Sequence, residues 1–477
     1  MGRKITIVGG GPGGYVSALR SAQLGAEVTL IEHENIGGTC LNWGCIPSKI
    51  MKRTAESSVM MKTAGSLGIE IDGKISVDLK AVYKRKEKIV KSQQDGIMKL
   101  LKRQRVKYIN GFATIPEPNL CLVRLSDKKS LEVPWEKLIL AVGSRSSDLP
   151  SISADHDNIL TSNDFFTLKK IPKSIMIIGG GVIGCEFAFI LKSLGSNVTI
   201  IEALPRLLPL PSVDEDCSKV LQREMKKRKI NFLLNRTVEG AVEKDGKILV
   251  KIIPSAPEKD LNQKDQGMQE LKVEKVMLCI GRKPNTSGIG LENIGVKTDA
   301  NGWITANEQM ETNVAGVYGI GDVLGPSKIM LAHVASAEGL IAAENSLGQL
   351  LRMDYNAVPN AIFTMPEVAN VGLTESQALD KGYNARSDRV FFRNIGKAQV
   401  IGEIAGEAKI VSDIENGKIL GIHLIGPHAT DLIAEGSLAL KMGCRVKDLS
   451  ETIHAHPTLS EIIFETAHAA LDRPLHG

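Results

Sequence analysis

The chain has 477 residues, of which 43% are hydrophobic and 24% charged, and its formal net charge is +5. At roughly 100–200 residues per domain, this length predicts three or four domains of an ordinary globular protein. The low positive charge and an aromatic content of 4% exclude a dense basic surface lined with aromatic residues, so no nucleic-acid partner is expected.

The beginning of the chain and its cysteines indicate the compartment. A strand, Lys4–Val8, starts almost at Met1, which leaves no room for a signal or transit peptide. The longest apolar stretch, from Ile175 to Leu191, is short for a bilayer span and contains Glu186. The seven cysteines are odd in number and thinly spread except for one pair, unlike a secreted disulfide framework. We therefore expect a cytoplasmic protein that does not contact a membrane.

A strand, a glycine-rich turn, a helix and a second strand occur twice in the chain. The first copy runs from Lys4 to Glu32 and the second from Ser174 to Glu202, offset by 170 positions without a gap. In the pattern G-x-G-x-x-G the glycines permit a tight turn, close approach of a pyrophosphate and close packing of helix on strand. The acid that ends each copy suits a ribose hydroxyl pair. Two complete copies predict two dinucleotide sites, with glycines Gly9, Gly11 and Gly14 in the first and Gly179, Gly181 and Gly184 in the second.

The acid of the second copy bears on the choice of nicotinamide nucleotide. A carboxylate at Glu202 accepts hydrogen bonds from a 2′-hydroxyl and repels a 2′-phosphate. Arg206 follows close by in sequence, but it lies beyond the expected strand end. The pattern favours NAD over NADP.

Two cysteines, Cys40 and Cys45, lie between the first acid and a lysine-rich helical stretch. A thiol near a helix N-terminus has a depressed pKa, which suits thiol–disulfide exchange. The alternatives are two unpaired cysteines or half of a zinc site, but zinc needs two more clustered ligands and none stand nearby. No metal site is therefore expected.

The segment from Gly37 to Lys49 reads GGTCLNWGCIPSK and resembles the redox-active disulfide motif of the pyridine-nucleotide disulfide oxidoreductases. The resemblance continues in order through Leu138–Ser144, Cys279–Asn285, Val317–Asp322 and Thr364–Glu375. It implies an α/β fold with two Rossmann-like domains, for FAD and then NAD, and a C-terminal α+β dimerisation domain. The expected divisions are an FAD-binding domain with the disulfide (1–147), an NAD-binding domain (148–280), a central domain that completes the FAD site (281–348) and an interface domain (349–477).

Two further segments indicate a branch of that family. HAHPTLSE, from His454 to Glu461, and LAHVASAEG, from Leu331 to Gly339, are similar to signatures of the dihydrolipoamide dehydrogenases. The implied reaction is oxidation of protein-bound dihydrolipoamide, with NAD⁺ as acceptor, through FAD and the disulfide. The chain departs from the usual pattern at Val142, where a threonine is common, and at the bulky Trp43.

The resemblance also implies roles for individual residues. His456 is the expected base and Glu461 orients it; Cys40 is the interchange thiol and Cys45 the thiol against the flavin. Lys49 is expected near the flavin, paired with Glu186, because an unpaired charge in the apolar start of that helix would be costly. The alternative without a functional role is a solvated lysine and a glutamate on the helix surface. The residues expected to contact the two cofactors are Gly9, Gly11, Gly14, Glu32, Gly38, Thr39, Lys49, Ala113, Gly143, Ser144, Gly179, Gly181, Gly184, Glu202, Gly281, Arg282, Asp322 and Ala332.

Partners follow from the same resemblance. We expect a homodimer in which His456 of one subunit faces Cys40 of the other, and lipoyl domains of 2-oxo acid dehydrogenase or glycine cleavage complexes as substrates. Apolar faces at 431–440 and 461–471 are candidates for the dimer interface, with intradomain core as the alternative. Two other functions remain open: an NAD(P)H-dependent reductase of another disulfide, and a flavoprotein scaffold without turnover.

Overall fold

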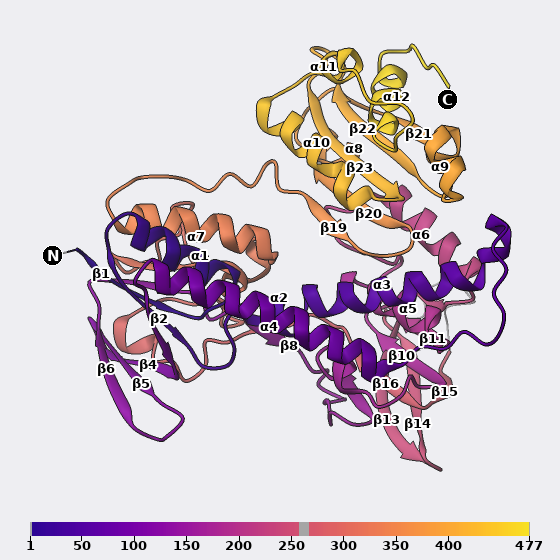
Figure 1. Ribbon diagram of the computed structural model, residues 1–477. Helices are drawn as coiled ribbons and strands as arrows, with labels where there is room; N and C mark the ends of the chain where they lie inside the picture. Colours follow the sequence, from indigo (N-terminus) through magenta and orange to yellow (C-terminus); the bar gives the residue numbers. More distant parts are fainter. Residues whose placement is uncertain (1, 257–266, 477) are drawn as a thin grey trace.

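The computed structural model describes residues 2–256 and 267–476, and Figure 1 shows their arrangement. Two five-stranded sheets with helices against them make up most of the first 346 residues, and a third five-stranded sheet lies in the C-terminal part. Within the described ranges, no helix is long and apolar enough to cross a membrane.

The first sheet is entirely parallel, in the order β18-β7-β1-β2-β3. Its central strand, β1, has four consecutive buried residues because helices cover both faces of a parallel sheet. The glycine turn follows β1 directly, at the carboxyl edge where the strand order reverses and where such sheets bind ligands. The strands are β1 (Lys4–Val8), β2 (Glu27–Glu32), β3 (Lys107–Asn110), β7 (Lys137–Leu140) and β18 (Val317–Gly319).

The second sheet repeats the first strand for strand. Its order is β9-β16-β10-β11-β12, again all parallel, with β10 in the place of β1. The internal repeat predicted from the sequence is therefore confirmed as a repeat of structure. The strands are β9 (Ile159–Thr161), β10 (Ser174–Ile178), β11 (Asn197–Ile201), β12 (Asn231–Leu233) and β16 (Lys275–Leu278).

The repeat extends further than the sequence indicated. In each unit a three-stranded antiparallel meander connects the third parallel strand to the one beside the glycine-turn strand. A two-stranded antiparallel ribbon then connects the units. The meanders are β4 (Phe112–Glu117), β5 (Leu120–Arg124) and β6 (Ser130–Pro134), and β13 (Arg236–Lys244), β14 (Lys247–Pro254) and β15 (Gln269–Val273); the ribbon is β8 (Ser144–Ser146) with β17 (Arg282–Pro284).

The C-terminal sheet is antiparallel, in the order β19-β20-β23-β22-β21, with helices packed on it. In Figure 1 it forms a separate orange and yellow body above the two parallel sheets. Together with the two Rossmann-like units it confirms the predicted fold class. Its strands are β19 (Asn360–Ile362), β20 (Glu367–Gly372), β21 (Ala385–Phe391), β22 (Glu407–Asp413) and β23 (Ile419–Gly426).

Two helix pairs position the functional residues. Helices α1 and α7 cross in contact beside the first sheet, and α3 packs against α5 from the second unit. The long α4 is capped by Asp78, whose carboxylate accepts hydrogen bonds from the amides of Lys80 and Ala81. The α-helices are α1 (Pro12–Gln23), α2 (Gly38–Asn42), α3 (Cys45–Lys62), α4 (Leu79–Arg103), α5 (Val182–Ser193), α6 (Glu215–Lys227), α7 (Ala332–Ser346), α8 (Glu375–Asp380), α9 (Gly396–Ile401), α10 (Ala429–Met442), α11 (Val446–Glu451) and α12 (Glu461–Ala470).

The faces suggested for the dimer interface are mostly intradomain core. Ile433 of α10 and both Ile462 and Ile463 of α12 are buried within the chain's own C-terminal core. Of the apolar residues on α10, Leu438 and Met442 are instead exposed, at 64% and 71%. Any contact between subunits through α10 must therefore use that outer face.

Candidate active site

The first glycine turn has the geometry of an anion-binding helix start. Gly9 adopts a φ of +106°, which side chains rarely allow, and a Cβ on Gly14 would collide with the Gly9 carbonyl oxygen. Helix α1 begins at Gly11 without a side-chain cap. The amides of its first turn are therefore available to a phosphate.

The second turn matches the first in each of these respects. Gly179 has a φ of +105°, a Cβ on Gly184 would collide with the Gly179 carbonyl oxygen, and α5 begins at Gly181 without a side-chain cap. Both turns therefore fit the pyrophosphate of a dinucleotide.

The acids Glu32 and Glu202 hold their own turns by the same pair of hydrogen bonds. Glu32 accepts from the amides of Gly10 and Glu34, at 2.7 Å each. Glu202 accepts from those of Gly180 and Leu204, at 2.6 and 2.8 Å. Each oxygen keeps a second lone pair for a ribose hydroxyl.

The Arg206 guanidinium, in contrast, is occupied inside the second unit. It donates to the carbonyl oxygens of Leu208, Leu210 and Val213 and to the Ser218 hydroxyl, at 2.6–3.1 Å. A 2′-phosphate would have to break these bonds to use this side chain.

The two motif cysteines lie on α2 and at the first position of α3, and both carry free thiols. The hydrogen bond from the Cys40 thiol lowers the pKa of Cys45 to about 7, and the Lys49 ammonium adds to this effect. The same hydrogen bond, together with burial, raises the pKa of Cys40. The pair is therefore asymmetric, with Cys45 the more acidic of the two thiols.

Lys49 and Glu186 are paired, as the sequence predicted. The Lys49 ammonium lies 2.9 and 3.1 Å from the two carboxylate oxygens of Glu186, whose side chain is only 8% exposed. Glu186 also accepts from the backbone amide of Phe363 at 2.9 Å, and the Phe363 ring lies 4.2 Å from the ammonium. Sequence reasoning missed Phe363, because it is distant in the chain and carries no charge.

A second group of polar side chains, Ser144, Arg282 and Asp322, lies at the ribbon that connects the two units. The Ser144 hydroxyl donates to Asp322 at 2.7 Å, and Arg282 donates to the hydroxyl and the carbonyl oxygen of Ser144 at 2.6 and 2.7 Å. Burial lowers the pKa of Arg282, while the negative charges of Asp322 and Cys45 oppose that effect.

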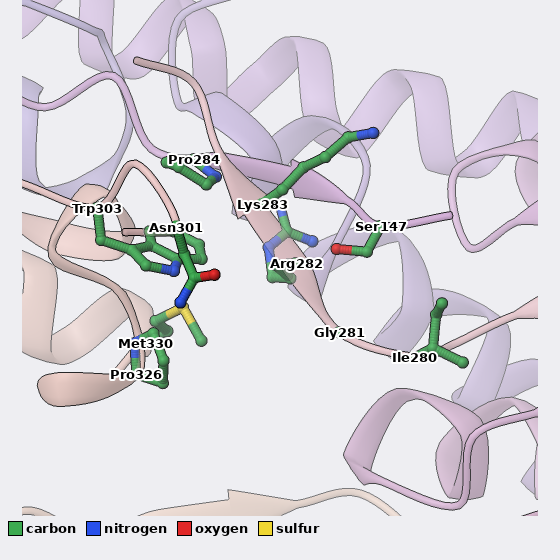
Figure 2. A pocket seen from close by; sticks show the side chains of 10 residues that line it. All are labelled: Ser147, Ile280, Gly281, Arg282, Lys283, Pro284, Asn301, Trp303, Pro326 and Met330. Atoms are coloured by element: carbon green, nitrogen blue, oxygen red, sulfur yellow. The ribbon is translucent and has the colours of Figure 1, made fainter. Parts of the chain in front are cut away.

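A cavity of about 480 Å³ opens beside this group, where the second unit meets the segment around Trp303. Figure 2 shows Arg282 and Lys283 on one wall, and Trp303, Asn301 and Met330 on the other. Ile280 and Gly281, which follow β16 and Cys279 in the chain, also line the cavity. Two of the expected cofactor residues, Gly281 and Arg282, thus border one cavity.

The His456 ring lies against Glu461 at the start of α12. His456 Nδ1 is 2.8 Å from one Glu461 oxygen, and the Thr458 amide donates to the other at 2.9 Å. Burial alone would raise the pKa of Glu461, but these two hydrogen bonds lower it. Since Nδ1 faces a carboxylate, Nε2 remains as the proton acceptor on a side chain that is 77% exposed.

The remaining expected cofactor residues lie around the first unit. Gly38 packs on the first glycine turn, because a Cβ there would lie 2.7 Å from the Gly11 Cα. Thr39 is exposed on α2, Ala113 is buried in β4, Gly143 follows β7, and Ala332 opens α7. No group of three or more His, Cys, Asp or Glu residues able to hold a metal ion occurs in the described part of the chain.

The two glycine turns, the uncapped helix starts and the acids Glu32 and Glu202 fit two bound dinucleotides. Comparison with known protein families also indicates two nucleotide sites. Residues 3–339 match the pyridine nucleotide-disulphide oxidoreductase model, and residues 358–467 match the dimerisation domain of the same proteins. The chain belongs to this family. Membership implies that it is a flavoprotein disulfide oxidoreductase that binds FAD and a pyridine nucleotide, and the dimerisation domain supports a homodimer.

Several relatives are similar over their full lengths. Dihydrolipoyl dehydrogenases of Chlamydia muridarum and Bacillus subtilis are each 39% identical, over 98% and 99% of this chain and 97% and 98% of theirs. The crystal structure of LpdA from Mycobacterium tuberculosis has a TM-score of 0.89 at 27% identity, over 98% of this chain and 99% of that one. The flavoprotein disulfide reductase RclA from Escherichia coli shares the fold, with a TM-score of 0.83 at 24% identity over 97% and 99%.

Proposed function

We propose that this chain is an NAD-dependent dihydrolipoyl dehydrogenase that oxidises protein-bound dihydrolipoamide in the cytoplasm. The observation that carries the proposal is the asymmetric pair of Cys40, on α2, and Cys45, at the first position of α3, which lies between the two glycine turns in the sequence. The relatives named dihydrolipoyl dehydrogenase, at 39% identity, support the substrate. The lipoyl domains of 2-oxo acid dehydrogenase or glycine cleavage complexes are the corresponding partners.

In this proposal His456 carries out the proton transfer of dithiol oxidation, and Cys40 and Cys45 carry out the disulfide exchange. His456 Nε2 takes the proton of one substrate thiol, and the resulting thiolate attacks Cys40 Sγ of the oxidised pair. The Cys40–Cys45 bond breaks, and Cys45 leaves as a thiolate stabilised by its low pKa. The second substrate thiol then displaces Cys40, which takes up the proton of that thiol and leaves as a free thiol, so the substrate closes its disulfide and the cysteine pair holds two electrons. FAD, held at the first glycine turn, would supply the chemistry that passes these electrons from the cysteine pair to NAD⁺.

The cofactors belong to separate units in this proposal. FAD would be held by the first turn and Glu32, with Ser144, Asp322 and Lys49 as further contacts and Cys45 as the thiol that exchanges electrons with it. NAD⁺ would be held by the second turn and Glu202, with Gly281 and Arg282 as further contacts. The engagement of Arg206 with its own unit supports NAD over NADP.

A substrate panel tests this function. Dihydrolipoamide with NAD⁺ should exceed glutathione, and should exceed every pairing with NADP⁺, by at least about 100-fold in kcat/KM. Cys45→Ser should remove turnover and the long-wavelength thiolate–flavin absorption while FAD stays bound, because the first turn does not involve the thiol. Equal efficiency with glutathione and NADPH would make the protein a reductase of another disulfide, and a flavin-containing protein without turnover would make it a scaffold.

The base and the thiols reach each other in this proposal only across the dimer. Figure 1 shows α12, which starts just after His456, on the far side of the C-terminal sheet from α2. An isologous two-fold interface would therefore build two sites, each with Cys40 of one subunit and His456 of the other. Co-refolded Cys45→Ser and His456→Ala chains should regain part of the activity, because each mixed dimer keeps one intact site. Mixed dimers without activity, or a fully active monomer, would contradict the shared site.

A further inference from the structure

Glu338 is a buried acid that the proposed chemistry does not use. It lies in the middle of α7 and is 1% exposed. One carboxylate oxygen accepts from the Gly321 amide at 2.6 Å, and the other accepts from the Tyr355 hydroxyl at 2.7 Å. A buried carboxylate with two donors of this kind is held in a single orientation.

The first of these bonds ends one residue from the cofactor group. Gly321 precedes Asp322, whose carboxylate accepts from Ser144 and lies 3.5 Å from Arg282 Nε. Among the described residues, Glu338 is the only hydrogen-bond acceptor of the Gly321 amide. An unpaired amide is unfavourable, so the turn would rearrange and take Asp322 with it.

The second bond ends on the connection to the dimerisation domain. Tyr355 lies between α7 and β19, and Lys328, just after the Asp322 turn, stacks over its ring at 4.9 Å. The same connection is tied to α7 two turns further along, where Asn345 exchanges hydrogen bonds with the backbone of Leu351 at 2.8 and 2.9 Å. The path of this connection is therefore fixed to the helix that supports the cofactor turn.

Helix α7 is itself fixed to the first glycine turn. A Cβ on Gly339 would lie 2.6 Å from the Gly13 carbonyl oxygen, and a Cβ on Gly13 would lie 2.9 Å from that of Ala335. The two helices can be this close only because both positions are glycine. Glu338, next to Gly339, thus lies where the turn of α1, the Asp322 turn and the connection to the dimerisation domain meet.

We propose that Glu338, anchored by Tyr355, is a positioning residue for FAD, which holds the Gly321–Asp322 turn in the conformation that retains the cofactor. This inference rests on the proposed location of FAD beside Asp322. It assigns to Glu338 no contact with reacting atoms. Its effect should therefore be seen in cofactor retention rather than in the proton or thiol chemistry.

The test measures the Kd and release rate of FAD, by flavin fluorescence, in reconstituted apoprotein variants. Glu338→Leu keeps the volume but removes the acceptor, and it should raise the Kd at least tenfold. Glu338→Gln should restore affinity to within about threefold, because its amide oxygen can accept from Gly321 and its NH₂ can donate to Tyr355. Tyr355→Phe should give a two- to fivefold loss, and Ser336→Ala, on the same helix but outside these contacts, should give none.

The outcomes separate the two proposals. If Asp322→Ala leaves the FAD Kd unchanged, the location of FAD is wrong. If Asp322→Ala weakens FAD but a folded Glu338→Leu behaves like Ser336→Ala, only the role of Glu338 is wrong. If the Glu338→Leu apoprotein does not fold, Tyr355→Phe decides, and an FAD Kd and release rate equal to those of the wild type overturn the inference. A loss that Glu338→Gln fails to restore also overturns it.

Discussion

The two glycine turns have the same backbone conformation but are packed against different residues. The first residue of the helix is Pro12 in the first unit and Val182 in the second. The residue after it is Gly13 in the first unit and Ile183 in the second. Gly13 is in contact with α7, whereas Ile183 packs against a hydrophobic cluster that includes residues of α3. The first turn is thus enclosed by a helix that returns from more than 300 residues later.

This difference suits the proposed assignment of FAD to the first turn and NAD⁺ to the second. A flavin that must stay through many turnovers benefits from a turn closed by α7 and by Gly38 of α2. A nicotinamide nucleotide that must enter and leave benefits from a turn at which a Cβ on Gly181 would meet nothing within 4 Å. The same backbone motif is therefore made tight or open by what packs on it.

Exchanging the residues at position 13 and position 183 should break the comparison most strongly. Gly13→Ile would force α7 away and should cost more than about 3 kcal/mol of stability, with loss of bound FAD. Ile183→Gly should cost about 2 kcal/mol through helix propensity and lost burial, and leave FAD bound. Denaturant unfolding and flavin content measure both, and a Gly13→Ile protein with full FAD would show that α7 does not distinguish the turns.

The pH dependence of the apoprotein should sharpen the comparison next. Burial raises the pKa of Glu338 to about 7; the Asp322 carboxylate adds to this, while Tyr355, the Gly321 amide and Lys328 oppose it. The folded state therefore binds this proton more tightly than the unfolded chain, where the pKa is about 4.3, and stability falls as pH rises from 4.3 to 7. The wild type should lose about 3 kcal/mol relative to Glu338→Gln over this window, measured by denaturant titration at pH 4.5 and 8. Parallel curves would contradict the assignment.

Removing one acid at a time should have the smallest effect. Glu202→Ala should weaken NAD⁺ binding by about 1–3 kcal/mol, relieve repulsion of NADP⁺ and leave FAD unaffected. Glu32→Ala should do the reverse, weakening FAD while NAD⁺ binds as before. Binding isotherms for both nucleotides in both variants are the measurement, and a crossed effect would show that the units are not independent.

The sequence predicted the parts of this molecule that depend on local patterns. The offset of 170 positions placed both turns, and the motifs around Cys40 and His456 identified pairs that the structure brings together. The pairing of Lys49 with Glu186 was predicted because a lone carboxylate in an apolar helix start needs a cation. Each of these inferences rests on residues whose partners are dictated by motif or by charge.

What the sequence left out depends on contacts between distant segments. Glu338 belongs to a signature that was noticed, but nothing local indicates that it faces Gly321 and Tyr355. The two meanders were missed because their strands belong to no motif. The apolar side of α12 was offered as a possible interface, since an amphipathic helix does not reveal which partner covers it. In each case the missing information is which surface packs on which.

The contact of Lys49, Glu186 and Phe363 has a consequence for anyone who would rebuild this protein from parts. Its three members come from α3, from α5 and from the segment after β19, so one carboxylate joins the cysteine helix, the second nucleotide unit and the dimerisation domain. A chimaera that imported a foreign second unit without an acid at position 186 would leave an ammonium and a backbone amide without their shared acceptor. Modular exchange in this architecture is therefore limited by one side chain at the junction, however well the transplanted sheet folds.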